Sequence, residues 1–240
     1  IDGASQQVGA AYLRGAARQY GRKWLLDASP WSTVHGGPGW GCVNGKWSGG
    51  VTDETQLRSW IYGYLAGADA VLQESSGGTH FRIDPYPDGP PDRPVITSTG
   101  RTARKAARFC FDLCPDRGTA YSPAAILMEH EHGFEPRPHT NFRLDGAWGY
   151  LPITEAEYSI EQFWYAAFPG HSSYPDKATA DPHDPCAVEP RILTASTFGD
   201  CFDVLTDRCP DDAMGRYPRL MTLGGVSTHA VLWRRLKAYA

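Results

Sequence analysis

Lys23-Trp24-Leu25-Leu26-Asp27 is a short apolar run that ends on a carboxylate, and Asp69-Ala70-Val71-Leu72-Gln73-Glu74 repeats this pattern later in the chain. Each run has the length of a buried strand, and a long loop rich in Gly or Pro follows it. In α/β enzymes the strand fixes the backbone of a catalytic residue, and the loop that follows shapes the pocket. The two runs therefore predict that Asp27 and Glu74 are pocket acids at neighbouring strand ends.

Helical patterns alternate with these two strands. Apolar spacing and capping residues predict helix 6–20, strand 24–27, helix 52–65, strand 68–73 and helix 98–113, in that order. No hairpin signal interrupts them, so we expect a parallel sheet with helices outside it and right-handed crossovers. The long loops after the strands, residues 28–53 and 75–97, are typical of the functional face of a (β/α) barrel.

A domain boundary is predicted at residues 114–118, and a second alternating region follows it. Its expected elements are strands at residues 124–128, 201–205 and 219–223, and helices at 158–168 and from about 228. This order predicts a small doubly wound domain over residues 119–240, after a first domain over residues 1–118. The region contains no G-x-G-x-x-G or P-loop pattern, so nucleotide binding is not indicated.

Composition and charge narrow the class of protein. The chain has 240 residues, of which 41% are hydrophobic and 21% charged, and its net charge is −4, as in a soluble globular protein. Without a basic run, neither nucleic acid nor an anionic membrane is an expected partner, and no motif calls for a cofactor. The six cysteines form no C-x-x-C pair, and we expect reduced thiols, which favours the cytoplasm. Both ends of the chain lie inside helical patterns, which predicts a fragment of a longer protein.

Several short motifs carry a family resemblance. Gly67-Ala68-Asp69-Ala70-Val71-Leu72 resembles the last barrel strand of clan A glycoside hydrolases, particularly the family 42 β-galactosidases, and Ser98-Thr99-Gly100-Arg101 resembles the helix start that follows it. The stretches 123–128 and 217–225 resemble strands of the glutamine-amidotransferase-like domain that comes after that barrel. The resemblance covers most of the chain as an order of elements.

The resemblance implies both a fold and an activity. The fold is the C-terminal part of a (β/α)8 barrel over residues 1–118, followed by a partial flavodoxin-like (glutamine-amidotransferase-like) domain that builds a homo-trimer in characterised relatives. The activity is hydrolysis of O-glycosidic bonds in a carbohydrate substrate by a carboxylate pair. The position of the nucleophile falls on Asp27, where the family has Glu, whereas Glu74 has the family's residue type on the next strand. The acid/base residue would precede Ile1, so this chain alone is expected to be inactive.

Aromatic residues are the second indication of a sugar site, because an indole face stacks on the apolar face of a pyranose. The chain has eight Trp, and core packing is the alternative role for most of them. The residues expected to line the site are Trp31, His35, Trp40 and Trp47 in the first long loop, and His80 and Phe81 in the second. Trp40 and Trp47 could instead pin their loop to the barrel rim, and His80 could simply be solvated.

Two further readings stay open. A non-catalytic carbohydrate-binding or assembly module on a degenerate barrel is favoured by the Asp at the position of the nucleophile. A metal-dependent hydrolase is suggested by Glu129-His130-Glu131-His132, since alternation in a strand would place the two His on one face. No third ligand is evident there at useful spacing, although His139 is close in sequence. Cys201 does not lie at a strand-to-helix elbow, so a cysteine nucleophile is not indicated.

Overall fold

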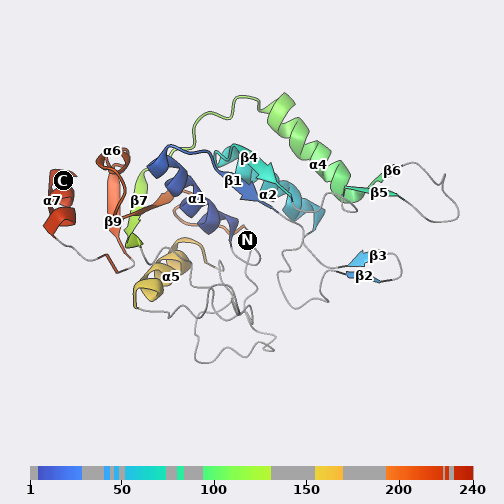
Figure 1. The fold of residues 1–240 in the computed structure, drawn as a ribbon. Helices are drawn as coiled ribbons and strands as arrows, with labels where there is room; N and C mark the ends of the chain where they lie inside the picture. Colours follow the sequence, from blue (N-terminus) through green and yellow to red (C-terminus); the bar gives the residue numbers. More distant parts are fainter. Residues whose placement is uncertain are drawn as a thin grey trace. The chain divides into compact units, whose positions relative to one another are not determined.

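The computed structural model describes residues 5–28, 41–43, 46–48, 52–73, 80–83, 94–130, 155–169, 193–223, 225–226 and 230–239. These residues form a mixed α/β protein, as the sequence predicts (Figure 1). The chain divides into two compact units. The first comprises Lys23–Ala120 with Ile1–Gly3, and the second comprises Ala4–Arg22 with Tyr121–Ala240.

The first unit is built around a parallel strand pair, which confirms the two strands expected there. Strand β1 (Leu25–Asp27) pairs with β4 (Ala70–Leu72), so that Asp27 lies opposite Leu72. Backbone hydrogen bonds from Asp69 N–H to Trp24 O and from Ala28 N–H to Leu72 O, both 2.9 Å, extend the ladder beyond both ends.

Two helices run side by side in this unit. Helix α2 (Asp53–Leu65) and helix α4 (Ser98–Arg108) meet at their first turns, where Thr99 Oγ1 donates to Asp53 Oδ1 at 3.0 Å. At the other end a π-helical turn, η1 (Phe109–Leu113), continues α4, and the ring of Phe109 contacts Tyr64 edge to face. The two helices are therefore parallel, as expected for consecutive β/α units.

Close approach of α2 to the strands depends on a glycine. A Cβ at Gly63 would lie 2.7 Å from Leu26 Cδ2 and 2.9 Å from Val71 Cγ2. The side chains of Leu26 and Val71 therefore point at α2, and only a residue without a side chain leaves room for them.

Two antiparallel hairpins lie in the long loops, where we found no hairpin signal in the sequence. Strand β2 (Gly41–Val43) pairs with β3 (Lys46–Ser48), and β5 (Phe81–Ile83) pairs with β6 (Pro94–Ile96). Each of these strands has three residues, which is too short to show the alternation of polar and apolar side chains that reveals a strand.

The second unit is a three-layer arrangement around a parallel sheet. Strand β7 (Ala124–Met128) lies between β8 (Phe202–Thr206) and β9 (Arg219–Thr222) and is parallel to both. All five residues of β7 are buried. The strands and the parallel pairing agree with the sequence prediction.

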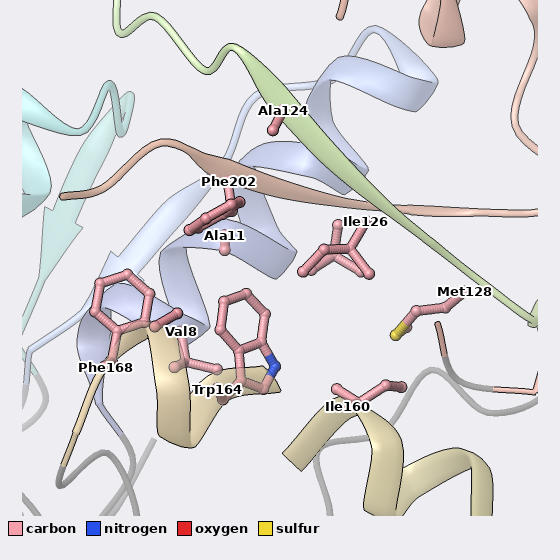
Figure 2. Packing of buried hydrophobic residues seen from close by; sticks show 11 residues of the cluster. Val8, Ala11, Ala124, Ile126, Met128, Ile160, Trp164, Phe168 and Phe202 are labelled. Atoms are coloured by element: carbon pink, nitrogen blue, oxygen red, sulfur yellow. The ribbon is translucent and has the colours of Figure 1, made fainter. Parts of the chain in front are cut away.

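Helices cover both faces of this sheet. Helices α1 (Gln6–Tyr20) and α5 (Glu155–Ala167) pack on one face, where Figure 2 shows Trp164 among Val8, Ile126 and Ile160. Helices α6 (Asp211–Met214) and α7 (Ala230–Tyr239) pack on the other face, against Leu127 and Leu205. Successive residues of β7 thus alternate between two apolar clusters, which is why the strand reads as a continuous apolar run.

Helix α1 belongs to the second unit, although we expected it in a first domain over residues 1–118. A Cβ at Gly15 would overlap the backbone of Val204, so the helix lies directly on β8. The Gln19 amide donates to Thr206 Oγ1 and accepts from Thr206 N–H, both at 2.9 Å. These partners lie far along the chain, and the sequence near α1 does not reveal them.

Candidate functional site at the carboxyl ends of β1 and β4

The candidate site lies where β1 and β4 end side by side. Asp27 is the last residue of β1 and is half-buried, and Gln73 directly follows β4. The hydrogen bond from Ala28 N–H to Leu72 O fixes the two strand ends relative to each other. The first turns of α2 and α4, joined through Thr99 and Asp53, follow the loops that leave this edge. The edge therefore has the arrangement in which parallel α/β folds place their sites.

Helix α2 holds the end of β1. Gln56 is 2% exposed, and its side-chain Nε2 donates to the backbone oxygen of Ala28. Trp60, one turn further along the helix, packs with Ala28 and with Ala106 of α4. The backbone that follows Asp27 is thus held by a buried hydrogen bond and by an aromatic contact.

His80 holds the end of β4. Its Nε2 lies 2.7 Å from Oε1 of Gln73, and its ring meets Trp60 edge to face with 6.0 Å between the centroids. An amide oxygen only accepts hydrogen bonds, so this contact is a hydrogen bond in the tautomer that carries its proton on Nε2 of His80. Burial lowers the pKa of His80 below its ordinary value, which favours the neutral ring.

The backbone of His80 is fixed by helix α4. Its carbonyl oxygen accepts a hydrogen bond from Thr97 N–H at 3.0 Å, and Thr97 Oγ1 caps the helix by accepting from Gly100 N–H at 3.0 Å. A Cβ at Gly100 would overlap the carbonyl oxygen of His80. Glycine at this position therefore lets the first turn of α4 rest against the loop that carries His80.

The strand pair has two unlike faces. Leu26 and Val71 point at α2, so alternation along each strand puts Leu25, Asp27 and Leu72 on the opposite face. Leu25 is 55% exposed and Leu72 is 54% exposed. The Asp27 carboxyl group therefore belongs to the face that turns away from the covering helix.

The structure describes only part of the set of residues expected at the site. Asp27 and His80 are described at this edge, Phe81 lies in β5 and is 53% exposed, and Trp47 lies in β3 opposite Cys42. Glu74, Trp31, His35 and Trp40 lie outside the described residues. The pairing of Asp27 with Glu74, and the sugar contacts of the loop tryptophans, stay predictions.

Three residues at this edge were missed from sequence: Gln56, Gln73 and Trp60. From the sequence we predicted Gln73 as the last residue of a strand and Trp60 as part of the apolar face of a helix. Amide side chains form no motif, because their role depends on the partner that the fold supplies. The only available signal was that Gln73 directly precedes Glu74, at the point where an apolar run becomes polar.

The hypothesis of a metal-dependent hydrolase gains no geometric support from the described residues. Strand β7 ends at Met128, so Glu129 and His130 are not part of the strand in which the alternation was expected. Asp207 accepts a hydrogen bond at 3.0 Å from the backbone N–H of His130, which is exposed, while His132 and His139 lie outside the described residues. Among the described residues, no group of three or more His, Cys, Asp or Glu could hold a metal ion.

Four cysteines are free thiols: Cys110, Cys114, Cys201 and Cys209. Burial raises the pKa of the Cys201 thiol, so it has little thiolate character and is a poor nucleophile. In the part of the chain that the structure describes, no helix is long and apolar enough to cross a membrane. Comparisons with protein-family models, with curated proteins and with solved structures found no match to this chain.

Proposed function

We propose that this chain is glycoside hydrolase-like and that a carbohydrate binds at the carboxyl ends of β1 and β4. One observation carries the proposal: Asp27 ends a parallel strand on the face that turns away from the covering helix. In a (β/α) barrel the catalytic side chains occupy this position, at the carboxyl end of a strand and on the inner side of the barrel. Asp27 and Glu74 are the proposed pocket acids, and Trp31 is the proposed stacking platform.

The exposed face of the strand pair supports the barrel part of the proposal. Parallel sheets are normally covered on both faces, because their crossover helices and neighbouring strands bury them. Here α2 covers one face, while Leu25 and Leu72 leave an apolar surface on the other. In the proposed barrel, this face is the interior side of two of eight strands.

The proposed chemistry needs two carboxyl groups. Retaining glycosidases hold them about 5 Å apart, whereas inverting enzymes leave roughly 6.5–9.5 Å for a water molecule. In the proposal Asp27 or Glu74 supplies the nucleophile, and the acid/base carboxyl comes from another strand of the barrel. This chain by itself is then expected to bind sugar without hydrolysing it.

The second unit supports a flavodoxin-like assignment. Counted along the chain, the three strands that the structure describes there stand in the order second, first, third, which begins the flavodoxin-like order, and helices cover both faces. Burial raises the pKa of the Cys201 thiol and makes it a poor nucleophile, so we propose a role in assembly for this unit, as a homo-trimer. Sedimentation of the chain at several concentrations tests the trimer.

Ligand-observed NMR with a panel of free monosaccharides and methyl β-glycosides tests the carbohydrate site. We expect binding of a sugar, which Asp27→Asn weakens, and no turnover of aryl β-galactosides by the chain alone. Asp212→Asn, at an exposed acid of the second unit, is the matched control and should leave binding unchanged. If no sugar in the panel binds, or if Asp27→Asn binds like the wild type, the proposal fails.

A second candidate, a non-catalytic carbohydrate-binding or assembly module, is favoured by the residue type of Asp27. Aspartate is one methylene shorter than the glutamate that the resembled family has at this position, which changes the reach of a nucleophile. A 2-fluoro glycoside separates the two candidates. Covalent labelling of Asp27 or Glu74 would favour hydrolysis, whereas binding without labelling would favour the module.

A further inference from the structure

We infer that the amino end of helix α1 binds an inorganic phosphate ion. The backbone N–H groups of the first turn and the hydroxyl of Ser5 would donate to the ion, and the side-chain oxygen of Gln6 would accept its proton. This site belongs to the second unit, and it does not depend on the proposed carbohydrate site.

The first observation is a pair of buried polar atoms. Ser5 is 0% exposed and Gln6 is 6% exposed. Within the part of the chain that the structure describes, Ser5 Oγ and Gln6 Oε1 have no hydrogen-bond partner. Such atoms are rare in folded proteins, because a polar group that loses water without gaining a new hydrogen bond is destabilising. The two atoms therefore point to a ligand that supplies the missing bonds.

The second observation is the first turn of α1. The helix has 15 residues, and it begins where Gly9 N–H donates to Ser5 O at 3.0 Å. The N–H groups of Gln6, Gln7 and Val8 precede this bond and have no acceptor inside the helix. Ser5 occupies the N-cap position, yet its side chain accepts from none of them, and the first turn carries no acid. The positive end of the helix dipole is thus left without a negative group of the helix itself.

The polar groups face the same end of the helix. Side chains on a helix lean back toward its amino end, because each Cα–Cβ bond is tilted in that direction. Gln6 is the first helical residue, so its side chain extends past the first turn, toward the end at which Ser5 lies. Val8 is 0% exposed, so its N–H group does not reach bulk water.

The first turn is also held in place from outside the helix. Thr194 N–H donates to Oε1 of Gln7 at 2.7 Å, and both residues are buried. The two residues are 187 positions apart, so a distant segment of the chain anchors the turn. Donors fixed in this way are suited to an anion, since they need no rearrangement when the anion binds.

The mixture of donors and acceptor favours phosphate among small oxyanions. The N–H groups and the Ser5 hydroxyl donate, as a negatively charged oxygen requires. Oε1 of Gln6 only accepts, so one oxygen of the ion must carry a proton. Inorganic phosphate keeps at least one proton at neutral pH, whereas sulfate has none. A buried water molecule is the alternative occupant.

Titration of the full chain with sodium phosphate at constant ionic strength tests the site, with nitrogen-15 NMR as the readout. We expect saturable shifts of the backbone amides of residues 6–8. Sulfate should bind about tenfold more weakly, because it leaves Oε1 of Gln6 without a donor. Amides that do not respond to phosphate would indicate a site filled by water and would overturn the inference. Equal affinity for sulfate would overturn the choice of phosphate.

Three variants test the residues. Ser5→Ala and Gln6→Leu each remove one partner and should weaken phosphate binding about tenfold. Ser5→Asp places a carboxylate at the N-cap, where it accepts from the same N–H groups. It should abolish phosphate binding and raise the thermal midpoint in phosphate-free buffer, and it carries the test if the other two variants do not fold. Wild-type phosphate affinity in Ser5→Asp would overturn the inference.

Thr52→Ala is the matched control. Thr52 is the N-cap of α2, and its side chain accepts from Thr55 N–H at 3.2 Å. The substitution should lower the stability of the first unit and leave the phosphate affinity unchanged. An equal loss of phosphate affinity in Thr52→Ala would show that the response is not specific to α1 and would overturn the inference.

Methyl phosphate distinguishes the free ion from a phosphate group of a larger molecule. Ser5 and Val8 are both 0% exposed, so we expect the site to exclude a group attached to the phosphate. Methyl phosphate should therefore bind more weakly than inorganic phosphate. Equal or tighter binding of methyl phosphate would overturn the assignment to the free ion.

Discussion

Nε of Arg14 in α1 lies 2.6 Å from Oδ1 of Asp203 in β8, although 189 positions separate the two residues. Asp203 is fully buried, and Ser122 donates to the same oxygen at 3.0 Å. Its other oxygen accepts from Arg18 at 2.5 Å and from Tyr217 at 2.7 Å. One carboxylate thus joins α1, β8 and the segments that lead into β7 and β9, and it makes α1 part of the second unit.

Asp203→Asn should strongly destabilise the second unit. The substitution leaves two arginines beside a neutral side chain, and breaking a buried ion pair typically costs about 3–5 kcal/mol. Urea unfolding measures this loss of stability, and hydrogen exchange of the α1 amides measures it locally. Asp212→Asn is the matched control: its pair with Arg216 is exposed, so it should change the free energy of unfolding by less than about 0.5 kcal/mol. Equal effects of the two variants would contradict the role of Asp203.

Tyr217 should make the second unit sensitive to alkaline pH. Burial, and then the neighbouring Asp203 carboxylate, raise the pKa of Tyr217 above its ordinary value of 10.0. The phenol therefore stays protonated in the folded chain at a pH where it ionises in the unfolded chain. This stabilising contribution is complete below about pH 10 and is lost as the pH rises further, through the folded-state pKa.

Tyr217→Phe removes that titration and also one hydrogen bond to Asp203. The free energy of unfolding should fall by about 1 kcal/mol at neutral pH. Above about pH 10, the free energy of unfolding of Tyr217→Phe should decline less steeply with pH than that of the wild type. The two slopes should differ by up to about 1.4 kcal/mol per pH unit. Urea midpoints across the alkaline range measure both effects, and parallel pH profiles would show that Tyr217 is not responsible.

Gly15→Ala should separate α1 from β8. The added Cβ would overlap the backbone of Val204, and neither the helix nor the strand can move without breaking neighbouring contacts. Overpacking of this kind costs roughly 1–3 kcal/mol, although alanine is the better helix former. Gly215→Ala is the control, because the nearest atom to its added Cβ is 3.4 Å away. Thermal unfolding of both variants should show a clear loss only for Gly15→Ala.

His80 should make the first unit lose stability in mild acid. Burial lowers the pKa of His80 below its ordinary value of 6.5, so the unfolded chain takes up the proton first as the pH falls. The contribution of the neutral ring is present above pH 6.5 and is lost as the pH falls through the folded-state pKa. His80→Gln should flatten this part of the pH profile, measured by hydrogen exchange of the β4 and α4 amides. An unchanged profile in His80→Gln would assign the acid sensitivity to other groups.

The elements that were predicted correctly are those with a local signal. Helix α1 and strand β7 have the same bounds as their predictions, because each carries a long periodic or continuous apolar pattern and a recognisable end. The parallel pairing of β1 with β4 followed from the alternation of strands and helices. The short hairpins were missed, because three residues carry no periodicity.

The candidate site was predicted only as a location. From sequence we expected polar groups at the ends of β1 and β4, and Asp27 and His80 were among the candidates. The link between His80 and Gln73 was not visible, although the two residues are only seven positions apart. It depends on Trp60 and Gly100, which come from two different helices.

The sequence by itself determined the kinds and order of the elements, because propensity, periodicity and capping act over a few residues. Only the tertiary structure decided which elements share a unit and which polar side chains share a partner. Arg14 meets Asp203 across most of the chain, and no local pattern records that pairing. The reason is physical: a buried charge or amide takes whichever partner the completed packing brings within hydrogen-bonding distance.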